Sequence, residues 1–219
     1  MKMYLNAVLL REVLHHVPIS QWSPSWRIFC YLTFLIPRTN RLLFLKAILE
    51  KWSGPISAAL ALTPAEYSSY SQSVKNVIPF SIPSRLTIVP FELDTRKAFP
   101  VNRLRNIAIK ACNTTHFLYN DIDFMPSGKT FSPRITGIDN LYENLMRIPE
   151  SFLNTNRQAI IVPAFEIYPK MKIDKRAFSS EWKRLKSLIP GNKSALATCM
   201  NSKHRDCIIF RDKAHLHVW

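Results

Sequence analysis

The chain has 219 residues, 47% of them hydrophobic and only 4 of them glycine, and its formal net charge is +15. The hydrophobic content excludes an intrinsically disordered chain. The scarcity of glycine, with no G-x-G-x-x-G or Walker pattern, argues against a glycine-rich phosphate loop. The charge favours an acidic partner such as nucleic acid, an anionic membrane, an acidic sugar or a nucleotide phosphate. No zinc-finger, RNA-recognition or K-homology signature supports a nucleic-acid binder.

The beginning of the chain differs in pattern from the rest. Residues 1–25 contain two prolines and predict an irregular lead-in with a helix around Val8–His16, and residues 26–219 predict one α/β domain. The short apolar run in the first ten residues does not have the shape of a signal peptide. The longest apolar run, Ile28–Ile36, has about half the length that a transmembrane helix needs.

The next elements alternate between strands and helices. Ile28–Ile36 is a continuous apolar run and predicts a buried strand. Thr39 or Asn40 then caps a helix that extends to Trp52 and ends before Gly54-Pro55. Ile56–Leu62 predicts a second strand.

A capping box opens the second helix. Thr63-Pro64-Ala65-Glu66 places the box residues three apart with proline at the first helical position, and the helix is expected to run toward Val77. Arg85–Phe91 predicts a third strand and Val101–Cys112 a clear amphipathic helix. Strands that alternate with helices predict an α/β fold with a mainly parallel sheet.

The stretch from His116 to Pro126 contains the main candidate site. An apolar run predicts a buried strand, and Asp121 and Asp123 follow it one residue apart. Ligands of open α/β sheets bind at this end of the strands. Two carboxylates so close together need a cation or hydrogen bonds, and divalent cations bound to phosphates use one or two carboxylates in this way. The alternative is a plain aspartate pair in a turn at the end of the strand.

The last third of the chain is less regular. A polar loop follows Pro126, and further elements are expected at Ile138–Ile148 (helix), Gln158–Phe165 (strand), Phe178–Ile189 (helix) and Cys207–Phe210 (strand).

Four cysteines are too few for a disulfide framework. Cys199 and Cys207 could pair in an oxidising compartment, or form a zinc site with His204, His215 and His217, although the spacing matches no standard zinc pattern.

Four motifs follow one another along the chain: Lys51-Trp52-Ser53-Gly54-Pro55-Ile56-Ser57, Asn102-Arg103-Leu104-Arg105-Asn106-Ile107-Ala108, Asp121-Ile122-Asp123-Phe124-Met125-Pro126 and Ile161-Val162-Pro163-Ala164-Phe165-Glu166. Together, and in this order, they resemble glycosyltransferase family 49, the LARGE and β-1,4-glucuronyltransferase group that extends the glycan of α-dystroglycan. The resemblance covers roughly residues 28 to 170. It implies a GT-A-like fold, a UDP-sugar donor (UDP-glucuronate or UDP-xylose), Mn²⁺ and a glycan or glycoprotein acceptor.

The resemblance also implies roles for individual residues. Asp121 and Asp123 would be the metal-binding pair, with Asp123 the direct ligand and Asp121 nearer the ribose or a metal-bound water. Arg105 and Asn106 would lie against the donor, where a guanidinium can pair with a diphosphate or a glucuronate carboxylate. Glu166 would be the catalytic base that an inverting transfer needs. The alternative roles are a helix-surface arginine for Arg105 and, for Glu166, a carboxylate at a helix start or in a loop, or an acceptor contact.

Family members continue beyond the point where this chain ends, and the family's N-terminal membrane anchor is absent here. The resemblance therefore implies the donor-binding part of a domain that is incomplete at its C-terminus, in a protein of the Golgi lumen. Two other functions stay open. One is a non-catalytic relative that binds acidic glycans or a partner enzyme, and the other is a basic nucleic-acid-binding domain, which would give Asp121 and Asp123 no role.

Overall fold

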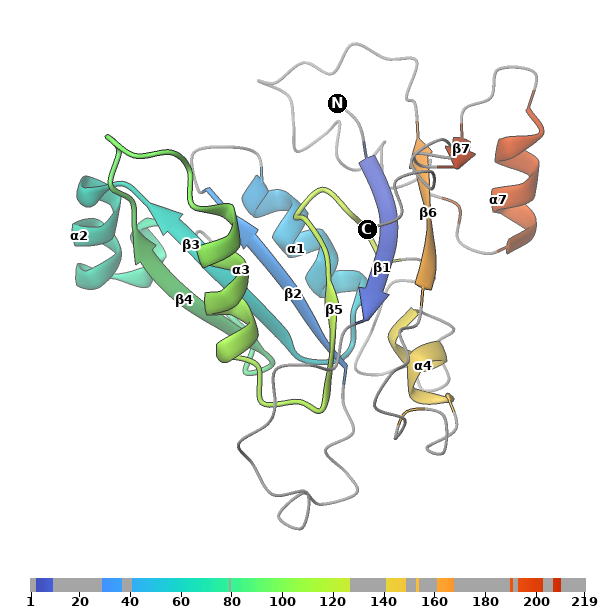
Figure 1. Ribbon diagram of the computed structural model, residues 1–219, viewed down its shortest axis with the longest axis horizontal. Coiled ribbons are helices and arrows are strands. Elements are labelled where there is room, and N and C mark those ends of the chain that lie inside the picture. Colours follow the sequence, from blue (N-terminus) through green and yellow to red (C-terminus); the bar gives the residue numbers. More distant parts are fainter. Residues whose placement is uncertain are drawn as a thin grey trace.

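The computed structural model describes residues 3–9, 29–36, 41–78, 80–126, 141–148, 153, 161–167, 190, 193–202 and 207–209 (Figure 1). In these residues the strands form one seven-stranded sheet with the order β4-β3-β2-β5-β1-β6-β7. The strands are β1 Met3–Leu9, β2 Phe29–Leu35, β3 Ile56–Leu62, β4 Leu86–Glu92, β5 His116–Tyr119, β6 Ile161–Ile167 and β7 Cys207–Ile209. The helices are α1 Arg41–Lys51, α2 Pro64–Gln72, α3 Val101–Lys110, α4 Leu141–Met146 and α7 Lys193–Met200, with a short 3-10 helix at Val74–Asn76.

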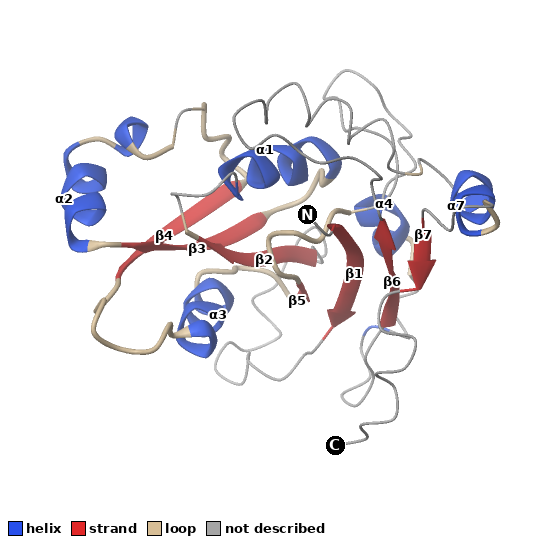
Figure 2. Ribbon diagram, turned by 90° about the horizontal axis from the view of Figure 1, so that it is seen from above, coloured by secondary structure: helices blue, strands red, loops and turns tan. Residues whose placement is uncertain are grey.

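The four strands β4, β3, β2 and β5 are all parallel. Helices α1, α2 and α3 connect them in sequence, and α1 and α3 lie on opposite faces of the sheet (Figure 2). The predicted α/β class with a mainly parallel sheet is confirmed. The predicted strands and helices between residues 28 and 119 are confirmed within a few residues, and α2 begins with the predicted capping box, in which Glu66 and Thr63 bond each other.

The expectation of irregular structure before residue 26 is wrong for Met3–Leu9, which forms β1 (Figure 1). This strand lies between β5 and β6 and is antiparallel to both. The register shifts between Leu5 and Ala7, so Asn6 interrupts the pattern as a bulge residue would. The partners of β1 lie more than a hundred residues away in the sequence, and no local pattern could indicate that pairing. The remainder of the helix expected around Val8–His16 lies outside the described residues.

In the last third of the chain, α4, β6 and β7 confirm three expected elements, with shifted ends. Helix α7 was not predicted, and the helix expected at Phe178–Ile189 lies outside the described residues. Cys199 of α7 and Cys207 of β7 form a disulfide with their Cα atoms 5.4 Å apart. Of the two interpretations of this pair, the structure therefore contains the disulfide. The three histidines of the zinc alternative lie outside the described residues.

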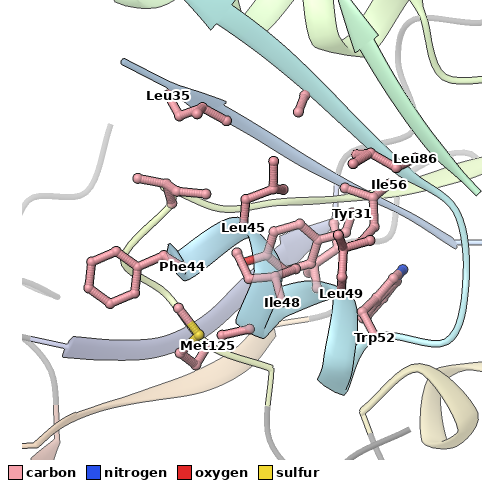
Figure 3. Packing of buried hydrophobic residues seen from close by; sticks show 14 of the residues in the cluster. Tyr31, Leu35, Phe44, Leu45, Ile48, Leu49, Trp52, Ile56, Leu86 and Met125 are labelled. Atoms are coloured by element: carbon pink, nitrogen blue, oxygen red, sulfur yellow. The ribbon is translucent and has the colours of Figure 1, made fainter. Parts of the chain in front are cut away.

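Two hydrophobic clusters cover the two faces of the parallel strands. Because strand side chains alternate between faces, Tyr31 and Leu35 of β2 face α1, whereas Leu32 and Phe34 face α3. Figure 3 shows the larger cluster, in which α1 residues such as Leu45 and Ile48 pack on β2 and β3. Strand β2 is buried on both faces, as its continuous apolar sequence predicts. None of the helices in the described part of the chain has the length and apolar character to span a bilayer.

Helix α4 packs against the junction between α1 and β3. The ring of Tyr142 packs edge-on against Trp52 with 5.0 Å between ring centroids, and Ser53 donates a hydrogen bond of 2.9 Å to Glu143. Gly54 lies directly under the Tyr142 ring, so a β-carbon at this position would overlap ring atoms. Glycine is required here because of this close approach.

We therefore predict that Gly54→Ala destabilises the chain by about 1–3 kcal/mol through overpacking. Thermal unfolding followed by circular dichroism should show a melting temperature lower by roughly 2–12 °C. The double variant Gly54→Ala/Tyr142→Ala is the control, since removal of the ring removes the overlap. If the two substitutions were simply additive, the overlap would not be the cause of the loss.

Candidate functional site

The two aspartates lie where the strand order reverses. From β2 the chain proceeds to β3 and β4 on one side and then returns to β5 on the other side of β2. Ligands of open α/β sheets bind at such a switch point, beyond the carboxyl ends of the strands. Asp121 and Asp123 follow β5 at this place, in a turn closed by a 3.0 Å hydrogen bond from the Phe124 amide to the Asp121 carbonyl.

The turn is attached to β2 on both sides of the aspartates. Before them, the Asn120 amide donates to the Leu32 carbonyl at 3.0 Å. After them, the Tyr31 hydroxyl donates to the Phe124 carbonyl at 2.6 Å. Tyr31 is fully buried, and burial raises the pKa of its phenol, so this group stays a neutral donor at physiological pH. Both aspartates are therefore held on a short segment that is fixed at its two ends.

Asp121 is engaged by two side chains. The Tyr119 hydroxyl donates a hydrogen bond of 2.7 Å to Asp121 Oδ1, and Arg105 Nη2 lies 3.6 Å from the same oxygen. Arg105 of α3 also donates from Nε to the Tyr119 hydroxyl, and its guanidinium carbon lies 4.6 Å from the centroid of the Tyr119 ring. The structure thus brings Arg105 and Asp121 together through a tyrosine that the prediction did not include.

Tyr119 was missed although the sequence contains a signal for it. Residues two apart on a strand face the same side of the sheet, so Tyr119 and the position of Asp121 share the face that α3 covers. Tyr31 had no such signal, because its contact with Phe124 joins residues that are 93 positions apart.

Asp123 is in a different environment from Asp121. Its carboxyl group is half-buried, and burial raises its pKa above the ordinary value. The negative charge of Asp121 raises the pKa of Asp123 further, whereas the positive charge of Arg41 acts in the opposite direction. A carboxylate that is partly desolvated beside a second carboxylate is stabilised by a bound cation.

The donor set fits one kind of metal site. Among the described residues, no group of three or more His, Cys, Asp or Glu side chains could hold a metal ion. Asp121 and Asp123 alone would fill only a few of the coordination positions of a bound metal ion. The pair therefore cannot form a site in which these side chains supply all the ligands. The pair does fit Mg²⁺ or Mn²⁺, which bind one or two carboxylates together with water and the phosphates of a substrate.

The other two predicted residues, Asn106 and Glu166, lie on α3 and β6. Asn106 is exposed on α3. Glu166 lies near the carboxyl end of β6, where its backbone pairs with Tyr4 of β1 and Ile208 of β7. Strand β1 separates β6 from β5, and Tyr119 and Ile161 lie opposite the same β1 residue, Val8. Strand β6 runs in the same direction as β5 and begins at the level where β5 ends, so Glu166 lies five residues beyond that level, and its role as a base stays a prediction.

The comparisons with known proteins place the chain beside one family of glycosyltransferases. The family described as glycosyl-transferase for dystroglycan matches residues 81–205. The chain is 33% identical over 147 residues to human xylosyl- and glucuronyltransferase LARGE1 and 31% identical over 147 residues to its Danio rerio counterpart. It is 33% identical over 132 residues to LARGE2 of Rattus norvegicus. These matches cover 58–62% of this chain but 17% of each relative, so the chain spans about a sixth of the length of the relatives it matches.

The half-buried carboxyl of Asp123 leads to a prediction on stability. Because the pKa of Asp123 is raised in the folded state, the folded chain binds more protons than the unfolded chain between the ordinary value of 3.8 and the raised value. Stability without metal therefore falls as pH rises through this window and stays lower at neutral pH. We expect Asp123→Asn to raise the melting temperature at pH 7 in EDTA by on the order of 1–3 °C, with a smaller gain near pH 4.

Asp121→Asn is the matched control. Asp121 accepts a hydrogen bond and pairs with Arg105, so its neutralisation removes a favourable interaction and should not raise the melting temperature. Equal rises in melting temperature for Asp123→Asn and Asp121→Asn would show that the effect does not depend on which of the two carboxylates is neutralised.

Proposed function

The chain belongs to the family of glycosyl-transferases for dystroglycan, and on this premise we propose that it forms the donor-binding part of a metal-dependent glycosyltransferase. The proposed reaction transfers glucuronate or xylose from a UDP-sugar to a glycan acceptor in protein O-glycosylation. The observation that carries the proposal is the placement of Asp121, Asp123 and Arg105 together at the switch point of a GT-A-like α/β sheet.

The carboxylates are proposed to hold the cation. Asp123 would be the direct ligand of Mn²⁺, and Asp121 would bind the ion or one of its waters. When bound, the ion would neutralise charge that develops on the diphosphate leaving group. The attachment of the turn to Leu32 and Tyr31 keeps both carboxylates in place without reorganisation during the reaction.

Arg105 is proposed to bind the donor. Its guanidinium offers donors in a fixed fork that matches a diphosphate or a glucuronate carboxylate. The side chain is about one-third exposed at the mouth of the aspartate turn, where it is accessible to a ligand. Asn106, the exposed next residue of α3, is proposed as a further polar contact to the donor.

Glu166 is proposed as the base that accepts the proton of the acceptor hydroxyl in an inverting displacement. Its support is the resemblance of the motif that ends in Glu166 to the corresponding family motif, since the register of β6 places Glu166 five residues beyond the level at which β5 ends.

We further propose a glycan or glycoprotein acceptor and a location in the Golgi lumen. The Cys199–Cys207 disulfide supports an oxidising compartment of this kind. The net charge of +15 supports an acidic donor or acceptor.

A non-catalytic role is the second candidate. The observation in its favour is the ion pair between Arg105 and Asp121, since a carboxylate that is neutralised by an arginine does not require a metal. Such a relative would use its positive charge to bind acidic glycans. A nucleic-acid-binding domain is the third candidate, and only the net charge favours it.

The proposed function predicts that UDP binds only with Mn²⁺. In calorimetric titrations of UDP into the folded chain, we expect binding in Mn²⁺, no binding in EDTA, and affinity reduced at least about tenfold in Asp123→Ala. Asp94→Ala is the control, because Asp94 is also a carboxylate but pairs with Arg96 and Lys97 before α3.

Three outcomes would contradict the proposal. UDP binding that is equal in EDTA would exclude the metal site. No UDP binding by a folded chain that binds an acidic polysaccharide would favour the non-catalytic relative. Binding to DNA or RNA that weakens steeply with salt, without UDP binding, would favour the third candidate.

A further inference from the structure

Arg105, Tyr119 and Asp121 each contact the other two side chains. The Tyr119 hydroxyl accepts a hydrogen bond from Arg105 Nε and donates one to Asp121 Oδ1, and Arg105 Nη2 approaches the same Oδ1. The guanidinium also lies over the Tyr119 ring. One tyrosine therefore fixes the distance between a cationic and an anionic side chain on two different elements, α3 and the turn after β5.

These contacts occupy the carboxylate that the proposed metal site needs. Asp121 Oδ1 already accepts the Tyr119 hydroxyl and faces a guanidinium. A divalent cation near this oxygen would meet the positive charge of Arg105 at a distance of a few ångströms, which is unfavourable. The ion and Arg105 therefore compete for Asp121.

The ion pair between Arg105 and Asp121 is exposed enough for Arg105 to change its partner. The side chains of Arg105 and Asp121 are 36% and 42% exposed, and ion pairs that water reaches contribute little to stability. A diphosphate bound at the same edge would offer Arg105 a stronger partner than a single carboxylate oxygen. Transfer of Arg105 from Asp121 to the diphosphate would remove the competition with the metal.

We infer that Arg105 is the resident counter-ion of Asp121 in the ligand-free chain, that Tyr119 is the positioning residue that holds it there, and that Arg105 moves to the diphosphate when donor and cation bind. This inference rests on the proposed function. It has the consequence that the cation binds weakly alone and that UDP and the cation strengthen each other's binding. The coupling is reciprocal, since each ligand must change the affinity of the other by the same factor.

The test measures two affinities in each variant. Mn²⁺ binding without nucleotide is followed by the loss of the free-ion signal in electron paramagnetic resonance, and UDP binding is measured by calorimetry at saturating Mn²⁺. In Arg105→Met, which keeps the length of the side chain without its charge, we expect Mn²⁺ alone to bind about three- to tenfold tighter and UDP at least about tenfold weaker. The two affinities change in opposite directions, which loss of structure would not produce.

Tyr119→Phe tests the hydrogen bonds of the Tyr119 hydroxyl separately from the charge of Arg105. The ring remains under the guanidinium, but the hydrogen bonds to Arg105 and Asp121 are lost. We expect Mn²⁺ alone to bind about two- to fivefold tighter, because the hydrogen bonds that hold Arg105 beside Asp121 are lost while the charge of Arg105 remains.

Arg103→Met is the matched control. Arg103 belongs to the same helix, is exposed, and stacks on Phe91 with 4.7 Å between its guanidinium carbon and the ring centroid. It carries the same charge, but no hydrogen bond or ion pair to Asp121 is present. The affinities of Arg103→Met for Mn²⁺ alone and for UDP at saturating Mn²⁺ should stay within about twofold of those of the unmodified chain.

The outcomes distinguish the inference from the proposed function. If the unmodified chain binds Mn²⁺ and UDP but Arg105→Met binds Mn²⁺ no tighter, the inference is overturned and the proposed function stands. If Arg103→Met shows the same gain as Arg105→Met, the effect is one of general charge and the inference is again overturned. If the unmodified chain binds neither ligand, the proposed function fails and the inference fails with it.

Discussion

The position of β2 in the centre of the parallel strands is the constraint on which the rest of the structure depends. β2 pairs with β3 on one side and β5 on the other, and its side chains enter both hydrophobic clusters. A shift of its register by one residue would exchange the two faces. Tyr31 would then leave the face on which it reaches the Phe124 carbonyl. The packing of the core and the attachment of the aspartate turn thus depend on the same strand.

Around this strand, two carboxylates close in sequence have different physical environments. Asp121 pairs with an arginine and accepts a hydrogen bond from a tyrosine hydroxyl, whereas Asp123 is half-buried beside a like charge and has a raised pKa. In the proposed function, donor binding would redistribute charge among Arg105, the two aspartates, the cation and a diphosphate.

The outer parts of the chain are joined to the centre by contacts that are not periodic. Tyr142 of α4 packs over Gly54 and against Trp52, next to the end of α1. The disulfide between Cys199 and Cys207 links α7 to the edge strand β7. The contact with Tyr142 explains why a glycine occurs at the α1–β3 junction in a chain that has only four glycines. It also connects α4 to the parallel strands, whereas the disulfide joins two elements that both follow residue 140.

The sequence alone determined the elements whose signals are local. The apolar run of β2, the capping box at Thr63–Glu66 and the stripe of α3 each act within a few turns of backbone, so their pattern predicted them. The aspartate pair was recognisable for the same reason, since it directly follows an apolar run. Only the tertiary structure decided the insertion of β1 beside β5, the contact of Arg105 with Tyr119 and Asp121, and the choice of a disulfide for Cys199. Each of these joins segments on different elements, and such pairings depend on the burial and hydrogen bonding of the whole sheet, which no local pattern contains.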